Sequence, residues 1–153
     1  MLKTEKEYQD PAVRQLSVFC QNRVGQFRDV LRHLEQAMVA VHAISVTDSA
    51  DFAVVRCIVD RTDAAIKVLK ENNFAFTEAT VLAVELPDDR KGLLEVCRAL
   101  IRAEININFA YALITRPKGK AAVVLNVDGF AAAVEVLRRN GFTLLDEHDL
   151  SAG

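Results

Sequence analysis

The tetrapeptide Asn-Arg-X-Gly at residues 22–25 has residue types that could hold a small ligand without transforming it. Glycine lets the backbone pass close to a bound molecule. Where a strand leads into a helix, the first N–H groups of the helix are unpaired and attract a carboxylate. The amide of Asn22 adds one acceptor and two donors. These groups would suit a zwitterion, but on its own the tetrapeptide is more typical of a capped turn.

Residues that could carry out catalysis are scattered. His33, His42 and His148 share no recognisable motif with a serine, a cysteine or a carboxylate. The three cysteines (Cys20, Cys57 and Cys97) are isolated in apolar patterns, so we expect buried, reduced thiols. No spacing fits a metal site, a phosphate-binding loop or a dinucleotide fingerprint. The sequence predicts a protein that is not an enzyme, with no catalytic residue, no metal and no cofactor.

The composition limits the class of partner. The chain has 153 residues, 51% of them apolar, and a net charge of −2, which does not favour nucleic acid or an anionic membrane. No apolar run approaches the roughly 18 residues that span a bilayer. Residues 1–14 form a polar lead-in without the apolar core of a signal peptide. We expect a cytoplasmic protein.

An internal repeat organises the chain. The segment DRTDAAIKVLKENNFAF, from Asp60, and the segment DGFAAAVEVLRRNGFTL, from Asp128, align at an offset of 68 residues. Upstream, NRVGQF (22–27) aligns with DRKGLL (89–94) at an offset of 67. Small insertions in loops and helix ends account for the drift in offset. The sequence predicts a tandem duplication, with domain one at 15–80 and domain two at 81–150.

Each half has the same predicted order of elements. In the first half, strands at 15–21, 39–46 and 52–59 and one beginning at 74 accompany helices at 25–38 and 62–72. In the second half, strands at 80–86, 105–114, 120–127 and 142–148 accompany helices at 92–103 and 129–139. The order βαββαβ is that of a ferredoxin-like unit. One such unit has a thin core, so we predict an α+β fold of two units whose antiparallel sheets pack side by side.

The arrangement resembles the ACT domain, a small regulatory module for amino acids. NRVGQF matches the loop of that family, with Val24 in place of its proline, and INI at 105–107 matches its second strand. The hairpin ADFAVVRCIV (50–59) resembles that of stand-alone tandem ACT proteins similar to the regulatory subunit of acetolactate synthase. The resemblance covers residues 15–150.

The resemblance implies a composite site. The loop of one unit would meet the second strand of the other unit at the interface. For the better site, it names a loop and two residues of the opposite strand: Asn22, Arg23, Val24, Gly25, Gln26 and Phe27, with Asn106 and Ile107. The reciprocal site has Ala40 in place of the asparagine and an acidic loop, so we expect it to be weaker. Its loop is Asp88, Asp89, Arg90, Lys91, Gly92 and Leu93.

The leading hypothesis is an amino-acid sensor that modulates a separate enzyme of amino-acid metabolism, as a homodimer. The alternative is a protein-interaction or oligomerisation module whose ligand site is vestigial, in which Asn-Arg-X-Gly is only a capped turn. A small enzyme or an RNA binder on the same fold is a third possibility. RNA readers of this topology need exposed aromatic residues on the central strands, and FAVVRCIV and KAAVVLNV offer almost none.

Overall fold

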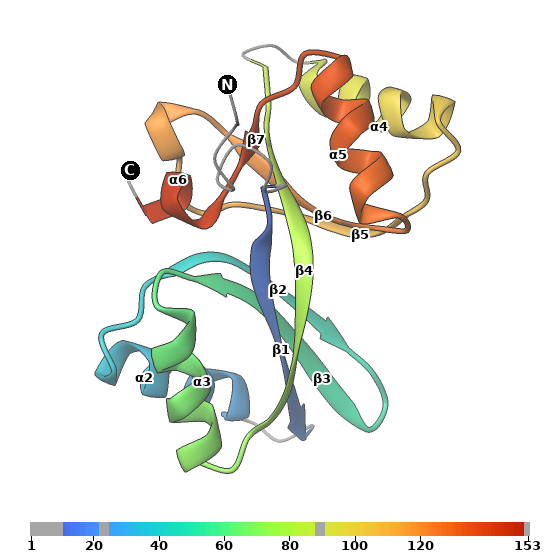
Figure 1. Ribbon diagram of the computed structural model, residues 1–153. Helices are drawn as coiled ribbons and strands as arrows, with labels where there is room; N and C mark the ends of the chain where they lie inside the picture. The colour runs from blue at the N-terminus through green and yellow to red at the C-terminus, as the bar shows by residue number, and fades with distance from the viewer. Residues whose placement is uncertain (1–10, 22–24, 88–90, 152–153) are drawn as a thin grey trace.

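The computed structural model describes residues 11–21, 25–87 and 91–151 of the chain. The first unit contains β1 (Val13–Gln21), α2 (Gln26–Gln36), β2 (Val41–Asp48), β3 (Phe52–Val59), α3 (Thr62–Glu71) and the start of β4 (Ala75–Glu85). The second unit contains the rest of β4, α4 (Gly92–Arg102), β5 (Ile107–Ala112), η1 (Pro117–Gly119), β6 (Ala122–Val127), α5 (Phe130–Arg139), β7 (Leu144–Leu145) and α6 (Glu147–Ser151). The α+β fold with two ferredoxin-like units is confirmed (Figure 1).

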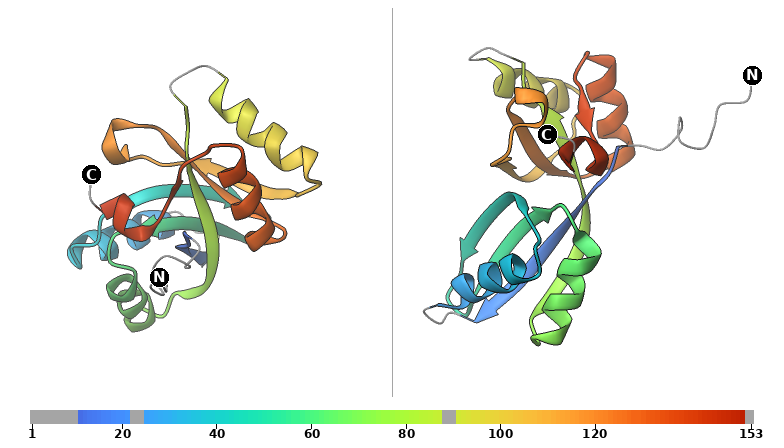
Figure 2. Two further views of the ribbon diagram at one scale, coloured as in Figure 1. Left: turned by 45° about the horizontal axis from the view of Figure 1, so that its top comes forward. Right: turned by 90° about the vertical axis from the view of Figure 1, so that its left-hand side faces the viewer.

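Strand β4 is shared between the two units. The sheet has the order β2-β3-β1-β4-β6-β5, and β7 also pairs with β4. Residues 75–81 of β4 pair with β1, whereas residues 82–85 pair with β6. The sequence interpretation placed two strands here, one beginning at 74 and another at 80–86. They form one continuous strand that passes from the first sheet into the second (Figures 1 and 2).

The residue pattern of β4 explains its two roles. Its first six residues are exposed or half-buried, and none of them is fully buried. The four apolar residues Val81–Val84 are all buried, which is typical of a strand covered on both faces. Leu82 and Val84 pack against the helices of the second unit, while Val81 and Ala83 face the first unit.

Three apolar clusters form the core. Helices α2 and α3 cover one face of the first sheet around Leu16, Val18 and Leu69. Helices α4 and α5 cover one face of the second sheet in the same way (Figure 1). The third cluster lies between the helix-free faces and contains residues of both units: Val13, Ala43, Ile58, Val81, Ala83, Ala122, Val124, Leu145 and Leu150. The interface between units is therefore part of the hydrophobic core.

The end of the chain differs from its sequence prediction. A strand was expected over 142–148, but β7 has only two residues and α6 follows it. The backbone N–H of Asp149 donates to Oδ1 of Asp146 at 2.8 Å, and the N–H of Asp146 donates to Oδ2 of Asp149 at 2.9 Å. This reciprocal capping starts a helix and ends the strand.

Two polar contacts join the helix-free faces. The hydroxyl of Tyr111 in β5 donates to Oε1 of Gln15 in β1 at 2.5 Å, and the Gln15 side chain is buried. The guanidinium carbon of Arg56 in β3 lies 4.2 Å from the centroid of the Phe109 ring, an arrangement that favours a cation–π interaction. Both contacts join β5 to the first sheet, and the bond to Gln15 is the costlier one to lose, because it would leave a buried polar group without its partner.

The two outer strands, β2 and β5, approach each other near His42. Ala43 and Leu113 form an isolated antiparallel bridge, and the N–H of Ile114 donates to the carbonyl of His42 at 2.7 Å. The His42 side chain is 7% exposed, and its Nε2 has no hydrogen-bond partner among the described residues. Burial lowers the pKa of His42, and the nearby charge of Asp60 opposes that shift. His42 is therefore favoured in its neutral form.

The Gln15–Tyr111 contact leads to a prediction about stability. Tyr111→Phe leaves the buried Oε1 of Gln15 without that donor and should destabilise the protein by about 1–3 kcal/mol. The double variant Gln15→Leu/Tyr111→Phe removes both partners and should lose less than the sum of the single variants. Urea unfolding of the four proteins gives the coupling energy. If the two single substitutions lower the free energy of unfolding by amounts that add up exactly in the double variant, the hydrogen bond contributes nothing to stability.

His42 predicts a loss of stability at mildly acidic pH. Because its pKa is lower in the folded state, the unfolded chain binds the proton more readily, and stability falls as the pH drops below the unfolded value of about 6.5. His42→Gln should reduce the difference in urea midpoint between pH 7.5 and pH 5.5. The matched variant of the exposed His148, His148→Gln, should keep that difference. An equal pH response in wild type and His42→Gln would contradict this account.

Candidate functional site

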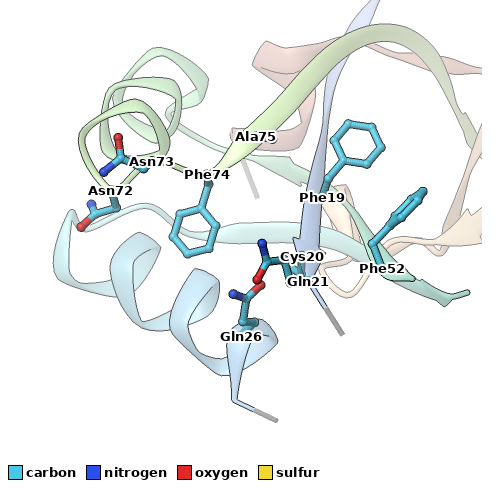
Figure 3. A pocket seen from close by; sticks show the side chains of 9 residues that line it. All are labelled: Phe19, Cys20, Gln21, Gln26, Phe52, Asn72, Asn73, Phe74 and Ala75. Carbon is cyan, nitrogen blue, oxygen red and sulfur yellow. The ribbon is translucent and has the colours of Figure 1, made fainter. Parts of the chain in front are cut away.

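A pocket of about 550 Å³ lies at the end of the first sheet, where β1 leads towards α2 (Figure 3). The end of β1, the first residue of α2, the start of β3 and the turn between α3 and β4 supply its lining residues. These are Phe19, Cys20, Gln21, Gln26, Phe52, Asn72, Asn73, Phe74 and Ala75. Phe74 extends from one side of β1, and Phe19 and Phe52 lie on the other side (Figure 3). The pocket volume falls within the range of small-molecule sites.

Gly25 forms the N-terminal boundary of helix α2 beside this pocket. Its φ is +94°, a left-handed conformation that glycine adopts without strain. The N–H of Asp29 donates to the Gly25 carbonyl at 2.9 Å and closes the first helical turn. No side chain among the described residues caps the helix, and the first N–H groups of an α-helix have no partner within the helix itself. Asn22, Arg23 and Val24 lie outside the described residues.

Among the described residues, the lining carries polar groups but no charged side chain. Gln21, Gln26, Asn72 and Asn73 contribute carboxamides, and three phenylalanine rings contribute apolar surface. The Nδ2 of Asn72 donates to the carbonyl of Val68 at 2.8 Å, which leaves its side-chain oxygen as an acceptor. Amide groups of this kind donate and accept hydrogen bonds without favouring a net charge. The pocket chemistry suits a neutral or zwitterionic molecule.

Phe27, Asn106 and Ile107, which were also predicted for the better site, do not line this pocket. Phe27 is exposed on α2 and Ile107 packs against the core of the second unit. The Nδ2 of Asn106 donates to the side-chain oxygen of Asn108 at 2.9 Å. Asn106 is not among the residues that line the pocket. Of the residues predicted for the better site, the described lining includes Gln26.

Strand register nevertheless puts Asn106 at the same end of the sheet as the pocket. Gln21 pairs with Phe52, and Asp48 pairs with Ala53, so β1 and β2 end where β3 starts. The antiparallel bridge between Ala43 and Leu113 places the start of β5 at that end as well.

The second junction has a different geometry. Gly92 begins α4, and a Cβ at this position would lie 3.0 Å from Cδ and from the carbonyl oxygen of Pro87. Gly92 is thus required by the close approach of Pro87, whereas Gly25 is required by its own φ. Lys91 precedes the helix, and Leu93 is half exposed and lines another pocket. Asp88, Asp89 and Arg90 lie outside the described residues.

Several lining residues could not have been identified as site residues from their sequence pattern. Phe52 opens the predicted strand at 52–59, where an apolar residue is typical of the core, but it is 42% exposed and lines the pocket. Asn72 and Phe74 served only as markers of the repeat. The structure shows why they line the pocket. Residues 72–75 connect α3 to the strand beside β1, and Phe19 pairs with Ala75.

The described lining of the pocket holds a single nucleophilic side chain. Cys20 is its one nucleophilic residue in the described lining, and burial raises the pKa of that thiol, which disfavours the reactive thiolate. Within residues 11–21, 25–87 and 91–151, no three His, Cys, Asp or Glu side chains are grouped to hold a metal ion. No helix in the same ranges is long and apolar enough to cross a bilayer.

Comparisons with known proteins agree with this architecture. The ACT domain pair family matches residues 11–152. The solved structure of protein BT0572 from Bacteroides thetaiotaomicron is 29% identical, with a TM-score of 0.83, over 91% of this chain and 95% of that one. The regulatory subunit of aspartate kinase from Thermus thermophilus has the same fold at 13% identity, with a TM-score of 0.58, over 86% and 93% of the two chains.

The regulatory subunit of aspartate kinase from Thermus flavus is similar at 11% identity, with a TM-score of 0.55, over 86% of this chain and 93% of that one. A comparison with curated proteins gave no significant match. The family match spans nearly the whole chain and agrees with the two βαββαβ units joined through β4. The protein therefore belongs to the ACT domain pair family.

Proposed function

We propose that this protein is a non-catalytic regulatory protein that binds an amino acid at the junction of β1 and α2. The observation that carries the proposal is the 550 Å³ pocket beside Gly25 and the start of α2, which no described side chain caps. The helix N–H groups and the helix dipole would receive the ligand carboxylate. The carboxamides would receive the ammonium group, and the phenylalanine rings would contact the side chain.

The lining also supports a class of ligand. Because it has no charged side chain in its described part, a charged ligand side chain would lose hydration without gaining an ion pair. We therefore propose that the preferred ligand is an amino acid with an uncharged side chain. Its binding would favour one arrangement of the two units, and a separate enzyme of amino-acid metabolism would respond to that arrangement. We propose that the protein acts in the cytoplasm as a homodimer.

Asn106 from the second unit would complete the site. This part of the proposal is supported by the strand register, which puts the start of β5 at the end of the sheet where the pocket lies. Asn22, Arg23 and Val24 would belong to the same site by their position in the sequence. The weaker site at Asp88–Leu93 has an acidic loop and would bind less well.

A second candidate function is an interaction module whose ligand site has been lost. The observation that favours it is an exposed apolar stripe on α4, where Leu94 and Ile101 lie two turns apart and Ile101 is 68% exposed. Such a stripe could contact a second copy or another protein. The two functions differ in one measurable respect, since only the first requires an amino acid.

A thermal-shift panel of the twenty amino acids tests the proposal. Ligand at about a hundredfold excess over Kd should stabilise the protein by about 2.7 kcal/mol, which raises the melting temperature by several degrees. We expect the shift with amino acids whose side chains are uncharged, and not with aspartate, glutamate, lysine or arginine. If millimolar concentrations of all twenty leave the melting temperature unchanged, the interaction module is the better account.

Gly25→Asp provides the matched variant for this panel. It places a carboxylate where the ligand carboxylate would bind, and it should abolish the ligand-dependent shift. Gly129→Asp is the control, because Gly129 also precedes a helix with a positive φ, of 74°. Both variants carry backbone strain of about 1–2 kcal/mol, so both should melt earlier without ligand. A normal ligand response in Gly25→Asp would exclude this junction as the site.

Asn106→Ala tests the contribution of the second unit. It should weaken amino-acid binding about fivefold or more if its amide bonds the ligand, since one hydrogen bond contributes about 1 kcal/mol. Asn126→Ala is the control, because Asn126 belongs to the same polar cluster through Asn108 but lies on β6. Isothermal titration calorimetry gives both affinities. Equal affinities would mean that the first unit binds the ligand alone.

A further inference from the structure

Helix α4 carries apolar side chains on its outward face. Leu94 is half exposed and Ile101 is 68% exposed, and their spacing of seven residues puts both on one side of the helix, two turns apart. Cys97 lies between them and is partly exposed. Figures 1 and 2 show α4 on the outside of the second unit, away from the first unit. Leu94, Cys97 and Ile101 together form an apolar stripe, which we call the α4 stripe.

The equivalent helix of the first unit is charged at the same positions. The buried residues of α2 and α4 align at an offset of 66, with Val30 against Val96 and Leu34 against Leu100. This alignment puts Arg28 at the position of Leu94 and Glu35 at the position of Ile101. The Arg28 side chain is 82% exposed, as expected for the solvated face of a helix. The apolar residues at the same two positions of α4 indicate that another surface covers its outward face.

The charges beside the α4 stripe indicate which surface that is. Glu95 follows Leu94 in the first turn of the helix, and Arg102 follows Ile101 in the last turn, so both lie on one flank of the stripe. Arg98 lies between them and already forms an ion pair with Glu95 at 3.0 Å. The flank is acidic towards one end and basic towards the other. Such a helix complements a second copy of itself that runs in the opposite direction.

We infer that two copies of the chain associate through α4, about a two-fold axis that makes the two helices antiparallel. Leu94 then packs against Ile101 of the second copy, and Glu95 pairs with Arg102 of the second copy. Each contact recurs by symmetry, because a two-fold interface uses the same residues on both sides. The contact gives a surface to the homodimer proposed above and rests on that part of the proposed function alone.

The size of the contact limits its strength. A pair of helices of 11 residues each offers less surface than the roughly 1,200 Å² that stable specific interfaces bury in total. We therefore expect a reversible dimer with a Kd on the order of 10 µM. Monomer and dimer should both be present at ordinary laboratory concentrations.

Sedimentation equilibrium over about 1–300 µM protein tests the association. Ile101→Glu gives α4 the residue that α2 carries at the equivalent position, so the helix should still form. The affinity of the dimer should fall at least about hundredfold, because each copy would bury an unpaired carboxylate against Leu94. Glu35→Lys is the matched control on α2 and should leave the affinity unchanged. A wild type that stays monomeric throughout, or a dimer that Ile101→Glu leaves intact, would overturn the inference.

An exchange of charges tests the antiparallel orientation. Glu95→Arg and Arg102→Glu each put like charges opposite each other and should weaken the dimer about three- to tenfold, since two exposed ion pairs are lost. The double variant Glu95→Arg/Arg102→Glu restores opposite charges and should recover most of the wild-type affinity. A double variant that is weaker than both single variants would show that the two residues do not face each other.

The amino-acid thermal shift separates the α4 contact from the proposed binding site. Ile101→Glu should lose the dimer and keep the ligand-dependent shift, because the β1–α2 junction belongs to the first unit. A monomeric wild type that still shows the shift would refute the α4 dimer alone. An α4 dimer that shows no shift with any amino acid would refute the binding site alone.

Discussion

A single strand, β4, belongs to two sheets, and this constraint determines how the two units are placed relative to each other. Its first residues complete the first sheet beside β1, and its last residues form the second sheet with β6 and β7. Two domains on a flexible linker could adopt many orientations. Two sheets that share a hydrogen-bonded strand are held in one orientation, and their helix-free faces pack together around Val81 and Ala83.

The alternation along β5 then serves two surfaces at once. Phe109 and Tyr111 face the first unit, where one contacts Arg56 and the other bonds Gln15. Ala110 and Ala112, between and beyond them, line a pocket together with Leu86 and Leu93. Alternate residues of β5 therefore make the contacts with Arg56 and Gln15, and the residues between them line the pocket. A larger residue at Ala110 or Ala112 would fill the pocket and leave the contacts with Arg56 and Gln15 in place.

Much of this fold could be predicted from the sequence, because the duplication repeats strong helix and strand patterns. The matched copies of Val68-Leu69 and Val136-Leu137 located the helices, and residues 52–59 were predicted as a strand with the bounds that β3 has. The fusion of two predicted strands into β4 could not be read, because Val81–Val84 has no turn residue to indicate either an end or a continuation. Helix α6 was missed because its capping depends on two aspartates that bond each other only after the turn forms.

Only the part of the candidate site whose residues are neighbours in the sequence could be predicted. The Gly25 junction was recognisable because a left-handed glycine and a helix start are neighbours in the sequence. The pocket wall formed by Phe52 and Phe74 was not, since it depends on which strands flank β1.

The bridge between β2 and β5 also has a mechanical consequence. The strand path begins at β2, passes through β4 and returns at β5 to within hydrogen-bonding distance of its start, so it is almost a closed ring. At the meeting point, the carbonyl of His42 accepts the N–H of Ile114, whereas the junction at β4 is a continuous covalent strand. Any hinge motion of the two units should therefore open the ring at His42 and pivot about β4. The two units are thus joined by backbone hydrogen bonding at His42 on one side and by the covalent strand β4 on the other.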